Sequence, residues 1–138
     1  MARDKVHQAV REALEKEGWL ITHDPLILRL GGVRLEIDLA AEQVLAAERD
    51  NEYIAVEIKS FLSKSKLTDF YEAKGKYDLY RLGLKKEERG RHLFLAIDKD
   101  IYKDFFQKSL IQEMVEEDKI SFLIFDNITR TIVEWIKK

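Results

Sequence analysis

Apolar residues near the start of the chain recur at helical spacing. Val6, Val10 and Leu14 lie four residues apart, so a helix over residues 4–17 would have one apolar face. Gly18 follows, at the position where a glycine commonly ends a helix. The pattern therefore predicts an amphipathic N-terminal helix.

The next apolar residues fall in short runs that are typical of strands. Gly31-Gly32 separates two of these runs and predicts a tight turn. A longer run from Tyr53 to Lys59 is rich in β-branched residues. The predicted strands span residues 26–30, 33–39, 44–48 and 53–59, and we expect the last two to form a β-hairpin.

The second half of the chain alternates between helical and strand patterns. The predicted elements are a polar loop over 61–66, helices over 68–82 and 101–117, and strands over 92–97, 120–125 and 131–136. Gly75 lies inside the first of these helices at a cost of about 1 kcal/mol, and we expect it to permit close packing against the sheet. This order of elements predicts an α/β fold, a mixed β-sheet flanked by helices, in one domain over residues 1–138.

The run over residues 53–59 carries an acid and a lysine on one of its two faces. Side chains alternate across a strand, so Ala55, Glu57 and Lys59 share one face and the β-branched residues point to the other. Charged groups at the end of an otherwise apolar strand are costly to remove from water. If Asp38 from a neighbouring strand joins them, two carboxylates and one lysine converge.

These three side chains have the chemistry needed for metal-dependent phosphodiester hydrolysis. Mg²⁺ prefers hard oxygen ligands and commonly uses one or two protein carboxylates. Asp38 and Glu57 are the candidate ligands for Mg²⁺ or Mn²⁺, with the backbone carbonyl of Ile58 as a third. Lys59 is the candidate to orient or deprotonate the attacking water, or to stabilise charge on the phosphate. The alternative interpretation is that Glu57 and Lys59 form the exposed face of an amphipathic strand and that Asp38 lies in an unrelated loop.

Composition narrows the class of protein. Of the 138 residues, 46% are apolar and 36% are charged, which is typical of a folded globular protein. Disulfides and thiolate metal sites are excluded because the chain has no cysteine. No apolar run approaches the length of a membrane span and no signal-peptide pattern is present, so we expect a cytoplasmic protein that does not enter a membrane.

Charge is distributed unevenly along the chain although the net charge is only −2. Residues 59–91 contain ten Lys or Arg against five Asp or Glu, and residues 98–118 contain seven acidic against three basic residues. This asymmetry permits one basic face on a mildly acidic protein. The alternative is that both stretches are ordinary solvated helix faces.

The histidines and aromatic residues offer no separate catalytic motif. His7, His23 and His92 share no zinc-binding spacing, and we expect His7 to be a packing or hydrogen-bonding residue. Tyr77 and Tyr80 fall on the apolar stripe of the helix over 68–82, so both are expected in the core. Trp19 and Trp135 are also expected to pack in the core or at an interface.

Several segments of the chain, taken in order, resemble the XisH family, the fdxN element excision controlling factors. The segments are Trp19–Pro25, Ile37–Leu39, Ala46–Glu48, Ile54–Leu62, Asp69-Phe70, Tyr77–Arg81 and Asp104–Phe106. The resemblance covers nearly the whole chain, and the run from Ile54 to Leu62 is its most specific part.

The resemblance implies a restriction-endonuclease-like fold of the PD-(D/E)XK superfamily. It would place Asp38, Glu57 and Lys59 in the metal-binding and catalytic positions of that superfamily. It also implies a role as an accessory factor in programmed excision of a DNA element, alongside a small partner protein called XisI. A site-specific recombinase is a further candidate partner.

The sequence departs from the family and superfamily patterns at two positions. Ile37 precedes the aspartate where the superfamily has a proline, and Lys76 stands where the family usually has a glutamine. A lysine can still contact phosphate as a point charge. We expect Lys64, Lys66 and Lys76 to contact DNA.

Two functions from different classes follow. The first is a metal-dependent nuclease-like protein that acts on DNA. The second is a non-catalytic accessory factor that uses the same fold to bind DNA or a recombination partner. Retention of Asp38, Glu57 and Lys59 favours the first, whereas the family role and the acidic net charge favour the second.

Overall fold

The computed structural model of the chain describes residues 2–43, 52–87 and 90–138. Its helices are α1 (Ala2–Lys16), α2 (Lys66–Glu87), α3 (Lys99–Lys103), the short 3-10 helix η1 (Phe105–Gln107) and α4 (Ser109–Asp118). Its strands are β1 (Leu20–His23), β2 (Leu26–Leu30), β3 (Val33–Ile37), β4 (Leu39–Gln43), β5 (Glu52–Ile58), β6 (Arg91–Asp98), β7 (Phe122–Asp126) and β8 (Thr131–Ile136).

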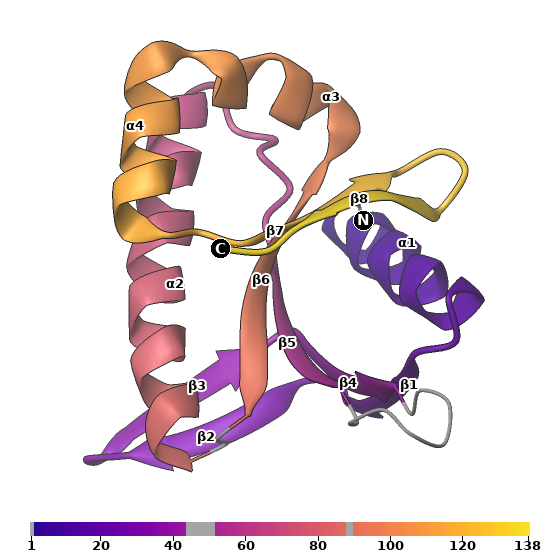
Figure 1. The fold of residues 1–138 in the computed structure, drawn as a ribbon, viewed down its shortest axis with the longest axis vertical. Coiled ribbons are helices and arrows are strands. Elements are labelled where there is room, and N and C mark those ends of the chain that lie inside the picture. Colours follow the sequence, from indigo (N-terminus) through magenta and orange to yellow (C-terminus); the bar gives the residue numbers. More distant parts are fainter. Residues whose placement is uncertain (1, 44–51, 88–89) are drawn as a thin grey trace.

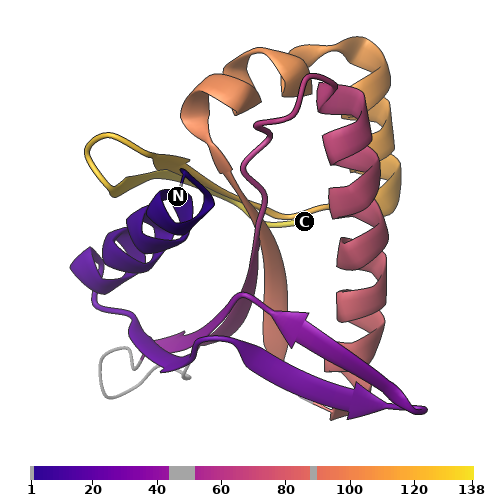
Figure 2. The ribbon, with the colours of Figure 1, turned by 180° about the vertical axis from the view of Figure 1, so that it is seen from behind.

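A six-stranded mixed sheet with the order β1-β4-β5-β6-β7-β8 forms the centre of the fold. The three central strands β5, β6 and β7 run parallel, and the outer pairs are antiparallel. Helix α1 covers one face, whereas α2 and α4 cover the other (Figures 1 and 2). The predicted α/β class with helices on a mixed sheet is confirmed, and this arrangement is consistent with a restriction-endonuclease-like fold.

Strands β2 and β3 form a separate two-stranded antiparallel sheet that projects from the central one. The turn at Gly31 and Gly32 connects them, with φ of +53° and +81°, values that favour glycine. The leucines of this hairpin pack against the C-terminal half of α2. The β2–β3 hairpin therefore extends the molecule on the side of the sheet that α2 covers.

Helix α1 buries the face that its sequence pattern predicts. Ala9, Val10, Ala13 and Leu14 are fully buried, and Ala9, Val10 and Leu14 join a core cluster with β4, β5, β6 and β7. Gly18 follows the helix with a φ of +86°, as expected for a C-terminal glycine.

The two tryptophans pack at the edge of the same cluster, which confirms their predicted packing role. The rings of Trp19 and Trp135 lie 5.6 Å apart, and Trp135 meets Phe94 edge-on at 4.9 Å. These contacts join the start of β1 to the C-terminal strand β8.

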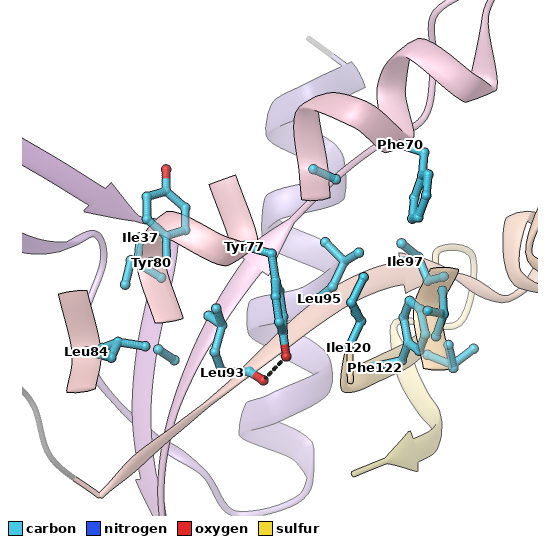
Figure 3. Close-up of a cluster of buried hydrophobic side chains, with 14 of the residues drawn as sticks. Ile37, Phe70, Tyr77, Tyr80, Leu84, Leu93, Leu95, Ile97, Ile120 and Phe122 are labelled. Carbon is cyan, nitrogen blue, oxygen red and sulfur yellow. Dashed lines mark hydrogen bonds between the residues drawn. The ribbon is translucent and has the colours of Figure 1, made fainter. Parts of the chain in front are cut away.

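The second core cluster lies between α2 and the opposite face of the sheet (Figure 3). Tyr77 and Tyr80 are buried there, as predicted, with exposed fractions of 1% and 8%. The Tyr77 hydroxyl donates to the Leu93 carbonyl at 2.9 Å and accepts from the Ser121 backbone N–H at 3.0 Å. This pair of bonds satisfies polar groups in the core and ties α2 to β6 and to the residue before β7.

The glycine that allows α2 to approach its neighbour is Gly83, and the prediction for Gly75 was wrong. Gly75 is exposed, with no atom of another element within 4 Å of the position of a Cβ. At Gly83 a Cβ would lie 2.9 Å from the Leu35 side chain and 3.2 Å from that of Leu30. The sequence shows that both glycines lie in the helix, but it does not show which side of the helix the β2–β3 hairpin packs against.

Two predicted elements are interrupted in the structure. The predicted strand over 33–39 divides at Asp38, because β3 pairs with β2 whereas β4 pairs with β5. The predicted helix over 101–117 is broken at Asp104, whose φ and ψ of −102° and −82° are not helical. That break lets Phe105 and Phe106 turn into the core, where their rings pack on Phe61 and Phe70.

Two further elements differ from the predictions, and one predicted strand lies outside the described residues. Strand β1 was not predicted, and α2 extends beyond the predicted helix over 68–82, since it begins at Lys66 and ends at Glu87. The predicted strand at 44–48 lies outside the described residues, and the partner of β5 in the hairpin is β4.

In the part of the chain that the structure describes, none of the helices is both long and apolar enough to traverse a lipid bilayer.

Candidate active site

Asp38 occupies the single position between β3 and β4, where the chain leaves the small sheet and enters the large one. Its Oδ2 accepts a hydrogen bond of 2.7 Å from the backbone N–H of Ile58. Because Ile58 is the last residue of β5, this bond places the Asp38 carboxyl group at the end of that strand. The predicted convergence of Asp38 with the end of the strand over 53–59 is present in the structure.

Glu57 is directed to the face of the sheet that α2 covers. Ala55 belongs to the core cluster beneath α2, whereas Ile54 and Val56 belong to the cluster beneath α1. Glu57 has the same parity as Ala55, and its side chain is only 4% exposed. The alternative in which this strand has an exposed charged face is therefore wrong for Glu57.

The environment of Glu57 favours its neutral form. Burial, the negative charge of Asp38 and a hydrogen bond with the Asp38 side chain raise the pKa of Glu57 to about 8, against the opposing effects of Lys76 and Lys59. Its buried Oε2 has no hydrogen-bond partner among the described residues. A buried carboxyl oxygen without a partner is costly, which makes this atom a candidate ligand for a bound group.

Lys59 is held by two acidic side chains of α2. Its Nζ lies 2.8 Å from Oε2 of Glu72 and 3.8 Å from Oδ1 of Asp69. Asp69 is 5% exposed, and its other oxygen accepts from the backbone N–H of Ser63 at 3.2 Å. Lys59 thus links the end of β5 to the first turns of α2, an interaction that the sequence did not predict.

A cleft of about 690 Å³ connects these side chains. Its charged or titratable lining residues are His7, Asp24, Arg34, Glu36, Asp38, Glu57, Lys59, Glu72, Lys76 and Tyr80. They come from five segments, namely helix α1, the turn that follows β1, strand β3, the end of β5, and helix α2. The cleft therefore lies where these five segments meet. The structure therefore brings Asp38, Glu57, Ile58 and Lys59 to one cavity.

One wall of the cleft is formed by a network that sequence reasoning missed. Asp24 accepts from Arg11 at 2.6 Å and lies 2.7 Å from Nε2 of His7, which confirms His7 as a hydrogen-bonding residue. His7 and Asp24 are 17 positions apart and join only when α1 packs beside the turn after β1. No spacing rule connects them, although Asp24 lies inside one of the segments that carry the family resemblance.

The three lysines expected to contact DNA lie in different settings. Lys76 lines the cleft. The ammonium group of Lys66 donates to the carbonyl of Phe61 at 2.9 Å and so closes the loop before α2. Lys64 is exposed in that loop and is not among the residues that line the cleft.

The donor set fits a divalent cation that keeps most of its water. Among the described residues no group of three or more His, Cys, Asp or Glu side chains is arranged to hold a metal. Two carboxyl groups, one with an unpartnered oxygen, match the one or two protein ligands that Mg²⁺ commonly uses. Such a site would be completed by water or by substrate oxygens.

The fold and the cleft together define a mixed α/β protein with a paired-carboxyl site at the end of a central strand. The chain belongs to the XisH family, since the model of that family, described as XisH protein, matches residues 1–133. Among curated proteins none matches the chain.

Two crystal structures are similar to this chain over nearly its full length. An XisH family protein from Nostoc punctiforme PCC 73102 is 41% identical with a TM-score of 0.90, and the alignment covers 97% of this chain and 100% of that one. An fdxN element excision controlling factor protein from Anabaena variabilis is 40% identical with a TM-score of 0.89, with 98% and 100% covered.

Proposed function

We propose that this protein is a metal-dependent nuclease of the PD-(D/E)XK type that hydrolyses phosphodiester bonds in DNA. The observation that carries the proposal is Glu57, a buried carboxyl group with an unpartnered oxygen beside Asp38 in an open cleft. A protein that needed only a stable core would gain by replacing this pair with apolar side chains. A divalent cation that both carboxylates hold gives a reason to keep it.

Each side chain of the site has a role in this proposal. Asp38 and Glu57 would hold Mg²⁺ or Mn²⁺, with the Ile58 carbonyl as a further ligand. A bound cation supplies charge relief at the phosphate and lowers the pKa of a coordinated water. Lys59 lines the cleft and would orient the attacking water or stabilise the phosphate, with its Nζ held by Glu72 and Asp69.

The biological setting that we propose comes from the relatives. The similar protein from Anabaena variabilis is described as an fdxN element excision controlling factor. We infer that this chain acts in excision of a DNA element, together with a small XisI-like protein and a site-specific recombinase.

A second candidate function is a non-catalytic accessory factor that binds DNA or the recombinase. The pairing of Lys59 with Glu72 at 2.8 Å favours it, because a lysine neutralised in this way contributes less to phosphate chemistry. In this case the buried carboxyl pair would serve to position a partner rather than a cation.

Cleavage of DNA distinguishes the two functions. The protein is incubated with single-stranded, duplex and branched DNA with Mg²⁺ or Mn²⁺, beside Glu57→Ala and Lys59→Ala. We expect metal-dependent cutting that both variants reduce by at least about a hundredfold, since each removes a group that acts in the transition state. Glu113→Ala and Lys108→Ala, both exposed and outside the cleft, are the matched controls and should cut normally.

The opposite result is equally clear. If no substrate is cut and both variants bind DNA as well as the parent protein, the nuclease proposal fails and the accessory function stands.

A further inference from the structure

The molecule has a second charged cleft, on the other flank of α2 from the candidate active site. It has a volume of about 720 Å³ and lies between the C-terminal half of α2, the start of β6 and the end of α4. The side chains of Leu82, Leu84 and Leu93 contribute apolar surface to it. Its charged lining residues are Asp78, Arg81, Lys85, Arg91, Lys119 and Lys138.

The two clefts have opposite charge balances. The second cleft has five cationic side chains and one acidic one, whereas the candidate active site has the acids Asp24, Glu36, Asp38 and Glu72 against three cations, and Glu57 adds a further negative charge only when it is ionised. An acidic cleft suits a divalent cation but repels the phosphates of DNA. Affinity for a polyanion therefore has to come from another surface, and the basic stretch over residues 59–91 supplies part of it.

The walls of the second cleft are fixed to each other. Arg81 donates from α2 to the Asp118 carbonyl at 2.8 Å and also contacts Asp78 at 3.2 Å. The backbone of Lys119 caps α4 in the left-handed conformation, with a φ of +53°. Lys85 and Lys119 are exposed and form no ion pair with another described residue. Two available ammonium groups thus stand on a rigid frame.

We propose that this second cleft, which we call the basic cleft, binds the phosphate backbone of DNA. The proposal takes DNA as the ligand from the proposed function but does not depend on cleavage. Lys76 at the active site and Lys85 at the basic cleft are nine residues apart on α2, about 14 Å along the helix axis. Because nine residues also turn the helix by about 180°, the two lysines lie on opposite flanks of α2, and a DNA molecule that contacts both clefts has to cross the exposed side of this helix.

The test is binding of a fluorescein-labelled duplex, measured by anisotropy in EDTA so that cleavage plays no part. The double variant Lys85→Glu/Lys119→Glu is compared with Lys103→Glu/Lys108→Glu, which makes the same change of charge at exposed lysines outside both clefts. We expect the first variant to bind at least about tenfold more weakly at about 100 mM salt. The slope of the logarithm of the binding constant against the logarithm of the salt concentration should also fall in magnitude by about 2. The second should stay within about twofold of the parent.

Several results would overturn the proposal. Among them are full affinity in Lys85→Glu/Lys119→Glu, equal losses in both double variants, and a parent protein that does not bind DNA. Displacement of the duplex by millimolar AMP as readily as by unlabelled DNA would assign the basic cleft to a small phosphorylated ligand. Unchanged thermal midpoints of the variants establish that they fold. Binding lost in these variants while cutting is absent from the parent protein would separate this inference from the failure of the nuclease proposal.

Discussion

Glu57 is the residue on which the function proposed for this protein depends. Strand alternation in the sequence predicts which face it occupies, and the structure confirms that face. The sequence does not predict that Glu57 is only 4% exposed, because its burial depends on tertiary packing on the face of the sheet that α2 covers. The partner that raises its pKa, Asp38, is 19 positions away and reaches it through the hydrogen bond to Ile58.

The raised pKa of Glu57 predicts a loss of stability as pH rises. The folded protein keeps this proton up to about pH 8, whereas the unfolded chain releases it near 4.5. Stability without metal should therefore be full below about pH 4.5, fall through the range up to 8, and lose at most about 5 kcal/mol. Glu57→Gln, which mimics the neutral form, should remove this decline.

The measurement is chemical denaturation at several pH values between 5 and 9 in EDTA. Glu113→Gln, an exposed substitution on α4, is the control and should follow the parent curve. Parallel curves for the parent and Glu57→Gln would contradict the pH dependence assigned to this carboxyl group.

Among the elements, α2 does the most to organise the molecule, because both clefts use it. Its residues at 72, 76 and 80 line the candidate active site, those at 78, 81 and 85 line the basic cleft, and the stripe between them is core. The apolar stripe through Phe70, Tyr77 and Tyr80 was predictable from helical spacing. The identity of the element that covers each flank was not, since it depends on the small β2–β3 sheet and on the end of α4.

The two glycines of α2 provide a matched pair for testing this packing. Gly75→Ala adds a methyl group to open solvent, so it should stabilise the protein by about 0.5–1 kcal/mol through helix propensity. At Gly83 the same methyl group would press on Leu28, Leu30 and Leu35, and the gain should be lost to strain, leaving this variant about 1–3 kcal/mol less stable than Gly75→Ala.

Urea denaturation of both variants measures the difference. Equal stabilisation by the two alanines would show that the β2–β3 hairpin does not pack closely on α2.

Sequence patterns predict some elements of this fold better than others. Helix α1 and strand β6 follow single periodic runs and are confirmed with small shifts at their ends. The break at Asp104 was not predicted, because the apolar spacing continues through it and the gain from burying Phe105 and Phe106 appears only in the tertiary structure. The division at Asp38 was missed for a similar reason, since a strand that changes sheets shows no change of alternation.

At the scale of the whole molecule, the candidate active site and the basic cleft lie on the two flanks of α2. The candidate active site gathers side chains from residues 6 to 80, and no local motif could have predicted that set. Strand alternation predicted that Glu57 and Lys59 share one face, and the family resemblance supported Asp38 as their partner. The basic cleft had only the charge asymmetry of residues 59–91 as its sequence signal, since Lys119 and Lys138 join it from elsewhere in the chain.

The central claim is that Asp38 and Glu57 together hold a divalent cation, and titration with Mn²⁺ followed by electron paramagnetic resonance tests it most directly. At about pH 8 the parent protein should lower the concentration of free Mn²⁺ in solution, and added Mg²⁺ should displace the bound Mn²⁺. Asp38→Asn and Glu57→Gln should each weaken binding by at least about tenfold, whereas Glu113→Gln should not. Equal Mn²⁺ binding by all four proteins, or none by the parent protein, would contradict the claim.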